Sequence, residues 1–187
     1  MLGYFRINDP YRLIGLLVIM TLLSLPLFID TPDVTVIELK SFVVGERVND
    51  GHALYHGTID STPPLTSWFY GLFDMVFGRS LTARHIFAFI LLFFQSAFLG
   101  IILIDKKVFS ENTYIPSLLF SLLVYISFDS LALTGELLAF GVLLLALNSL
   151  IKEIEFRTPR DETSFNVGIF ISLASMFSFS YAIYLPG

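Results

Sequence analysis

Residues 87–104 read FAFILLFFQSAFLGIILI, and this run decides the fold class because it holds no charged residue before Asp105-Lys106-Lys107 ends it. A helix needs about 20 mostly apolar residues to cross the roughly 30 Å hydrocarbon core of a bilayer. The run therefore predicts a membrane-spanning helix. Other apolar stretches raise the expected number of spans to about five. They cover residues 13–29, 115–133 with an interruption at Asp129, 137–151 and 167–185.

The composition of the whole chain agrees with this fold class. Of its 187 residues, 55% are hydrophobic and 14% are charged, which lies outside the usual balance of a soluble domain. Eleven basic residues against sixteen acidic ones leave no basic face for nucleic acid. The absence of cysteine excludes disulfides, thiolate nucleophiles and thiolate metal sites. The sequence therefore predicts an all-α integral membrane protein whose main partner is the lipid bilayer and not nucleic acid.

The distribution of lysine and arginine predicts the orientation, because translocated loops are depleted in these residues. With the N-terminus inside, most basic residues fall on the inner side, and the remainder lie in one long outer loop. We therefore expect a multi-pass protein with a cytoplasmic N-terminus. We treat residues 1–187 as one transmembrane domain with an extracytoplasmic loop at residues 30–84. Since the last apolar stretch is followed only by Pro186-Gly187, we expect the chain to be the N-terminal part of a longer one.

Two short helices are predicted in the outer loop. The motif Thr-Pro-Asp at residues 31–33 places a hydroxyl, a proline and an acid in the order that favours a helix start, and this helix is expected to end near Val48. The motif Ser-Thr-Pro-Pro at residues 61–64 is a second start, and Gly78 ends the helix after about 14 residues. That length is too short to cross a bilayer. Both helices are therefore expected to lie along the membrane.

Each of these helices has a polar and an apolar side. In the first, small and polar residues recur at helical spacing, and the apolar positions between them suit a helix that rests on the membrane or on the bundle. These polar-side positions are Thr35, Glu38, Ser41, Gly45 and Asn49. In the second helix, Trp68 and Tyr70 are expected at headgroup depth, and Asp74 is expected to be solvated.

A series of residues in the outer loop carries a family resemblance. It comprises Glu38, Gly51, Tyr55, Pro63-Pro64-Leu65-Thr66-Ser67-Trp68, Phe77-Gly78 and Arg84. In order and approximate spacing it resembles the first extracytoplasmic loop of the membrane glycosyltransferases of the C superfamily, particularly the aminoarabinose and mannosyl transferases. Glu136 is similar to an acid of that family near the outer start of the fourth span. The later helices also resemble a family of uncharacterised bacterial inner-membrane proteins.

The resemblance implies a glycosyltransferase-like protein that uses a polyprenyl-phosphate-linked sugar at the outer face of a bacterial inner membrane. We expect no cofactor and no metal site. Transfer needs a base that accepts a proton from the acceptor, and Glu38 is the catalytic candidate for this role. The substrate-binding candidates are Arg47, His52, Tyr55, His56, Asp60, Arg84 and Glu136. The basic side chains among them are candidates to hold the phosphate.

Two positions depart from the family pattern. The catalytic aspartate of the family falls on Ile37, beside Glu38, and a lysine that precedes the two prolines falls on Thr62. An adjacent helix position points about 100° away, so Glu38 is not an automatic replacement. The departures favour an alternative, a non-catalytic polytopic membrane protein that serves as a scaffold or lipid-binding partner in an envelope complex. A transporter ranks last, because no paired broken helices or midplane charges are visible.

Overall fold

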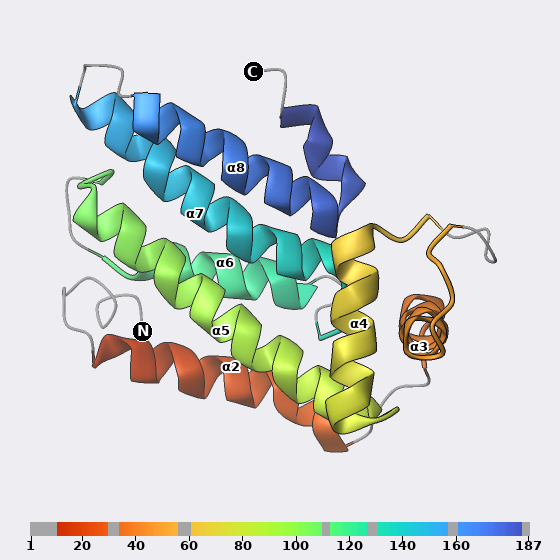
Figure 1. Cartoon of the computed structure of the whole chain (residues 1–187). Coiled ribbons are helices and arrows are strands. Elements are labelled where there is room, and N and C mark those ends of the chain that lie inside the picture. Colours follow the sequence, from red (N-terminus) through yellow and green to blue (C-terminus); the bar gives the residue numbers. More distant parts are fainter. Residues whose placement is uncertain are drawn as a thin grey trace. The chain divides into compact units, whose positions relative to one another are not determined.

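The structure of the protein is a computed structural model (Figure 1) that describes residues 11–29, 34–55, 61–109, 113–126, 131–156 and 161–184. These residues form helices and their connections, without a strand, which confirms the all-α class for the described part of the chain. The helices are α2 (Arg12–Ile29), α3 (Val36–Asn49), α4 (Pro64–Phe77), α5 (Leu81–Asp105), α6 (Ile115–Ile126), α7 (Gly135–Phe156), α8 (Asp161–Phe177) and the 3-10 helix η1 (Phe179–Tyr184).

Three helices are long and apolar enough to cross a membrane, namely α2, α5 and the Gly135–Lys152 part of α7. The other two predicted spans do not reach that length among the described residues. Helix α6 has 12 residues up to Ile126, and residues 127–130 after it lie outside the described part. Helix α8 has 17 residues and ends at Phe177, well before residue 185. One reason for this end is a tertiary contact, because the Thr66 hydroxyl donates a hydrogen bond of 2.6 Å to the Phe177 carbonyl, one of the groups that a helix end leaves unpaired. The total of about five spans stays a prediction.

The chain divides into two compact units, residues 1–33 with 89–131 and residues 34–88 with 132–187. In the first unit α2 contacts α6, and the hydroxyls of Ser24 and Tyr125 lie 2.6 Å apart. Ser96 donates a hydrogen bond of 2.7 Å to the Ser117 carbonyl, and a Cβ atom at Gly100 would collide with the Ser117 hydroxyl. Small and polar residues therefore contribute to the helix contacts of this unit, as is usual between helices in lipid.

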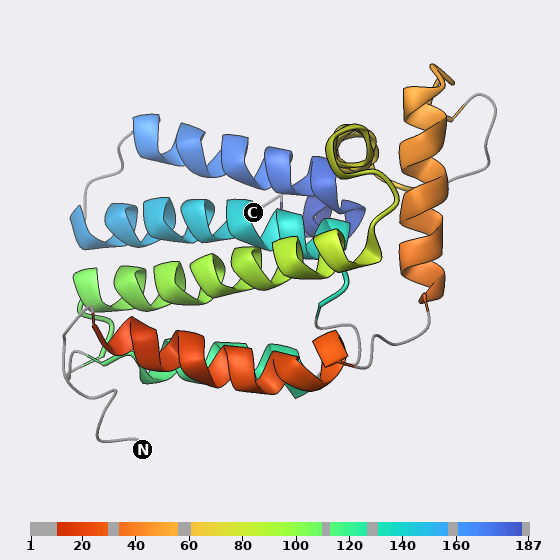
Figure 2. The same ribbon diagram turned by 90° about the horizontal axis from the view of Figure 1, so that it is seen from below.

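The second unit contains α3, α4, the first two turns of α5, α7 and α8. Helices α7 and α8 lie side by side and antiparallel (Figures 1 and 2), and α3 crosses α4, which also contacts α8. The core of the unit is a cluster of five buried residues, Val44, Tyr70, Phe73, Ala88 and Leu133. The candidate catalytic and substrate-binding residues that the structure describes all belong to this unit.

The ends of α3 and α4 follow from local sequence. Thr35 caps α3 in a capping box with Glu38, so the helix begins at Val36 and the predicted start at residues 31–33 is wrong. Residues 31–33 themselves lie outside the described residues. Helix α3 ends at Asn49, close to the predicted Val48. Helix α4 has the predicted 14 residues, with Pro64 in its first turn. It ends where predicted, because Gly78 has a φ of +63°, which glycine adopts without strain.

Helices α3 and α4 each bury a side that carries several polar residues, and each exposes several apolar ones. In α3 the buried residues include Glu38, Ser41 and Gly45, whereas Val36 and Leu39 are exposed. Phe42 and Val44 are also buried, so only some of the apolar residues of α3 face away from the unit. In α4 Tyr70 is 4% exposed and its hydroxyl donates to the Leu133 carbonyl at 2.9 Å. The expected depth of Tyr70 in the membrane stays a prediction, but its side chain faces the inside of the unit, where a buried hydroxyl needs such a partner.

Candidate functional site

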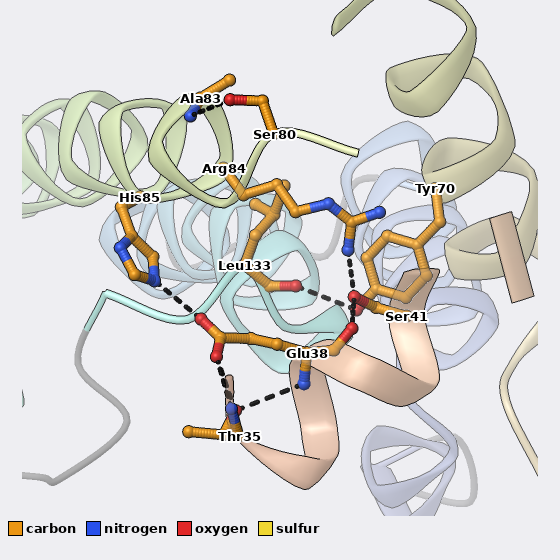
Figure 3. A network of polar contacts seen from close by, with 9 residues as sticks. All are labelled: Thr35, Glu38, Ser41, Tyr70, Ser80, Ala83, Arg84, His85 and Leu133. Atoms are coloured by element: carbon orange, nitrogen blue, oxygen red, sulfur yellow. Dashed lines mark hydrogen bonds and ion pairs between the residues drawn. The ribbon is translucent and has the colours of Figure 1, made fainter. Parts of the chain in front are cut away.

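Glu38, the predicted catalytic residue, is buried at the first turn of α3. Its Oε2 accepts hydrogen bonds from the backbone nitrogen of Thr35 at 2.9 Å and from the Thr35 hydroxyl at 2.8 Å. Its Oε1 lies 2.7 Å from Nε2 of His85 (Figure 3). Burial acts to raise the pKa of Glu38, but the hydrogen bonds from His85 and Thr35 outweigh it and lower the pKa below the usual value of 4.5. Both oxygens of this carboxylate are therefore hydrogen-bonded within the protein.

Arg84 lies beside His85 in the first turn of α5 and is the largest fully buried side chain in the described part of the protein, at 1% exposure. Its Nη2 donates to Oδ1 of Asp74 at 2.6 Å, and its Nη1 donates to the Ser41 hydroxyl. The guanidinium also lies over the ring of Phe42, 3.9 Å from the ring centroid. A buried arginine requires such pairing, because an isolated charge is costly away from water.

The expectation that Asp74 is solvated is wrong, because its side chain is only 7% exposed and is paired with Arg84. Ser41 connects this pair to Glu38, because its hydroxyl donates to the Glu38 carbonyl at 2.6 Å and accepts from Arg84. We name the five residues Glu38, Ser41, Asp74, Arg84 and His85 the buried charge cluster. It ties α3, α4 and the start of α5 together.

Two glycines allow α3 and α4 to approach closely enough for this cluster to form. A Cβ atom at Gly45 would collide with Oδ2 of Asp74, and a Cβ atom at Gly71 would lie 2.7 Å from Cγ1 of Val48. A larger residue at either position would push the helices apart. The recurrence of Glu38, Ser41 and Gly45 along α3 was the sequence signal for this contact, and it marks a packing surface.

A first cavity, of about 330 Å³, lies between α3 and residues 52–55. Most of its wall is apolar, and its basic side chains are Lys40, Arg47 and His52. The other lining residues are Val36, Leu39, Val43, Val44, Val48, Ala53, Leu54, Tyr55, Thr62 and Ser67. Three of the predicted substrate-binding residues, Arg47, His52 and Tyr55, are thus brought together.

Tyr55 has an unusual backbone in this cavity wall. Its φ is +67°, a left-handed conformation that non-glycine residues rarely adopt. The Tyr55 hydroxyl donates a hydrogen bond of 2.7 Å to the Thr62 carbonyl. This bond connects the residues after α3 to the residues before α4.

A second cavity, of about 410 Å³, lies where the starts of α3, α4 and α7 meet the end of α8. Its lining is more polar and includes Glu136, Tyr70 and Thr134. The other lining residues are Ile37, Lys40, Ser41, Ser61, Thr62, Pro63, Thr66, Gly135, Phe177, Ser178, Phe179 and Ser180. Burial raises the pKa of Tyr70 to about 12, and of the nearby charges Arg84 lowers it while Glu136 raises it. The Tyr70 hydroxyl therefore remains neutral at physiological pH.

Lys40 and Thr62 line both cavities, so the two cavities adjoin at these residues. The Lys40 Nζ atom donates to the Ser61 hydroxyl at 3.4 Å. Glu38 and Arg84 are not among the residues that line either cavity. The predicted residues thus separate into a buried pair and a cavity group of Arg47, His52, Tyr55 and Glu136. His56 and Asp60 lie outside the described residues.

His85 and Lys40 were not singled out from the sequence. His85 follows Arg84 directly at the start of an apolar span, a position where ionisable residues are costly unless paired, and this was the signal that could have identified it. Among the described residues, no group of three or more His, Cys, Asp or Glu side chains is placed to hold a metal ion.

Comparison with other proteins identified no relative of this chain. No protein-family model matches the chain, and no curated protein and no solved structure is significantly similar to it. The likeness to the C-superfamily glycosyltransferases therefore rests on the order of motifs in the outer loop.

Proposed function

We propose that this protein is a membrane-embedded, glycosyltransferase-like protein that binds a polyprenyl-phosphate-linked sugar at the outer face of a bacterial inner membrane, with its N-terminus in the cytoplasm. The observation that carries the proposal is the pair of adjoining cavities. One is mostly apolar with basic side chains, the other is more polar and includes a carboxylate, and Lys40 and Thr62 belong to both. A reaction between a lipid-linked donor and a polar acceptor needs two such neighbouring sites.

The first cavity has the chemistry for the donor. Apolar side chains such as Leu39 and Val43 suit an isoprenoid chain, and Lys40, Arg47 and His52 suit its phosphate. Arg84 is not part of this proposal, although the family resemblance implied it, because its guanidinium is buried against Asp74.

The second cavity has the chemistry for the acceptor, and Glu136 is the proposed base. In the reaction the acceptor oxygen bonds to the anomeric carbon while its proton passes to Glu136. The sugar–phosphate bond breaks, and its electron pair leaves with the polyprenyl phosphate. Lys40, next to both cavities, is placed to stabilise the departing charge. Glu38 holds α3 in place through Thr35 and His85 and is a positioning residue.

A second candidate function is binding of the lipid phosphate without catalysis. The observation that favours it is the position of Ile37, which lines the polar cavity at the place where the family pattern has its aspartate. Glu38 does not compensate, because both of its oxygens are hydrogen-bonded inside the protein. Such a protein would act as a scaffold or lipid-binding partner in an envelope complex.

The test measures both binding and transfer with radiolabelled polyprenyl-phosphate sugars in membranes that contain the protein. Wild type is compared with Glu136→Gln, and Glu46→Gln is the matched control because Glu46 is exposed, pairs with Arg79 and lines neither cavity. We expect Glu136→Gln to lower transfer by about 10²-fold or more and to retain binding, and Glu46→Gln to change neither. Binding without transfer in wild type would select the second candidate, and absence of binding would exclude both.

A further inference from the structure

Helix α4 presents an exposed apolar stripe. Trp68, Leu72, Met75 and Val76 follow one another at i, i+4, i+7 and i+8, which places them on one side of the helix. All four are exposed, Trp68 at 66% and Met75 at 74%. None of them lines either cavity. We name these four residues the α4 stripe.

The residues on the opposite side of α4 indicate that the exposed side of the helix faces an apolar environment. Thr66, Ser67, Tyr70 and Gly71 are buried there, and the Asp74 side chain is buried with Arg84. A helix on the surface of a water-soluble protein has the reverse arrangement, with its polar side outward. Helices that contact lipid pack through small and polar residues and expose apolar ones.

The position of α4 in the chain indicates which apolar surrounding it meets. Only Gly78, Arg79 and Ser80 separate it from α5, which is long and apolar enough to cross a membrane. Since a residue extends the chain by at most about 3.6 Å, the end of α4 lies close to the start of that span. Arg79 at this connection is exposed and paired with Glu46, as suits a charged pair in the headgroup layer.

We propose that the α4 stripe is a membrane-contact surface whose partner is the acyl-chain region of the lipid bilayer. With 14 residues the helix is about 21 Å long, too short to cross the hydrocarbon core of about 30 Å. It therefore lies along the membrane with Trp68 toward the acyl chains and Asp74 toward the protein. This inference does not depend on the proposed glycosyl transfer.

Trp68 is the single tryptophan of the chain and so reports on the stripe without any substitution. The experiment reconstitutes the wild-type protein in phosphatidylcholine vesicles with and without bromine on the acyl chains and measures tryptophan fluorescence. We expect brominated lipid to remove most of the emission and the water-soluble quencher acrylamide to have little effect. Strong quenching by acrylamide without quenching by bromine would overturn the proposal, as would protection from both quenchers by a second copy or a bound protein.

Two double variants test whether the contact is restricted to the stripe. In Trp68→Phe/Leu72→Trp the tryptophan stays on the stripe one turn later. In Trp68→Phe/Phe69→Trp it moves to a side that packs against the core of the unit. We expect brominated lipid to quench the first variant several-fold more than the second, and equal quenching of the two would overturn the assignment of this face.

Discussion

The buried charge cluster and the first cavity each contain an arginine of the outer loop, and the two arginines differ in what surrounds their charge. Arg84 is 1% exposed and held by Asp74 and Ser41. Arg47 lies in the last turn of α3, on the wall of a cavity. The charged residues of this loop therefore divide into a structural set and a cavity set, although both sets contain the same residue types.

The two carboxylates of the predicted site differ in the same way. Glu38 accepts hydrogen bonds at both oxygens and is 5% exposed, whereas Glu136 lies in the first turn of α7 at the wall of the second cavity. If this division is right, substitutions in the buried charge cluster will change stability, and substitutions in the cavities will change binding and transfer.

The largest expected effect is that of Arg84→Met on stability. It leaves Asp74 buried without its partner, which should lower the free energy of unfolding by about 3–5 kcal/mol. Thermal unfolding in detergent micelles measures the change. Arg79→Met is the control, because its ion pair with Glu46 is exposed and is worth about 0–1 kcal/mol. Equal losses for the two variants would contradict the structural role of Arg84.

A smaller effect is expected for Gly45→Ala. The added methyl group collides with Asp74, and such overpacking typically costs about 1–3 kcal/mol. Gly168→Ala on α8 is the matched control, since a Cβ atom there meets nothing within 4 Å, and it is expected to be neutral or stabilising by roughly 0.5–1 kcal/mol. If Gly45→Ala behaves like this control in the unfolding experiment, α3 and α4 are farther apart than described.

Glu38 is expected to make the protein sensitive to acid. Because its folded pKa lies below the usual 4.5, its contribution to stability is complete above pH 4.5 and is lost as the pH falls through the folded value. Glu38→Gln should abolish this part of the pH dependence and cost roughly 1–2 kcal/mol at neutral pH. Unfolding measured between pH 7 and acid pH, at constant salt, tests both. If the free energy of unfolding of the variant falls with pH as it does in wild type, groups other than Glu38 cause the pH dependence.

The smallest effect on stability is expected for Arg47→Gln, within about 0.5 kcal/mol of wild type. Binding of a polyprenyl-phosphate sugar to the same variant should weaken about tenfold, which corresponds to roughly 1.4 kcal/mol. Thermal unfolding and lipid binding on one preparation separate the two quantities. A large loss of stability would move Arg47 from the cavity set to the structural set.

Local sequence predicted the helices of the outer loop better than it predicted their environment. The end of α4 at Gly78 and the end of α3 near Val48 followed from residues within one turn. The burial of Glu38 and Asp74 did not, because their partners His85 and Arg84 come from the next helix of the unit. A stripe of small polar residues on a helix indicates a solvated side in a water-soluble protein. In a protein surrounded by lipid, the same stripe indicates the side that packs against other helices.

From the amino-acid sequence alone, the all-α class, the apolar helices and the C-terminal ends of α3 and α4 could be predicted, because helix propensity, capping and apolar length act over a few neighbouring residues. The tertiary structure alone decided which charges pair and which line the cavities. The pairing of Arg84 with Asp74 requires α3 and α4 to approach at Gly45 and α5 to begin beside them, and the energy of a charge in a buried place depends on the groups that surround it in space.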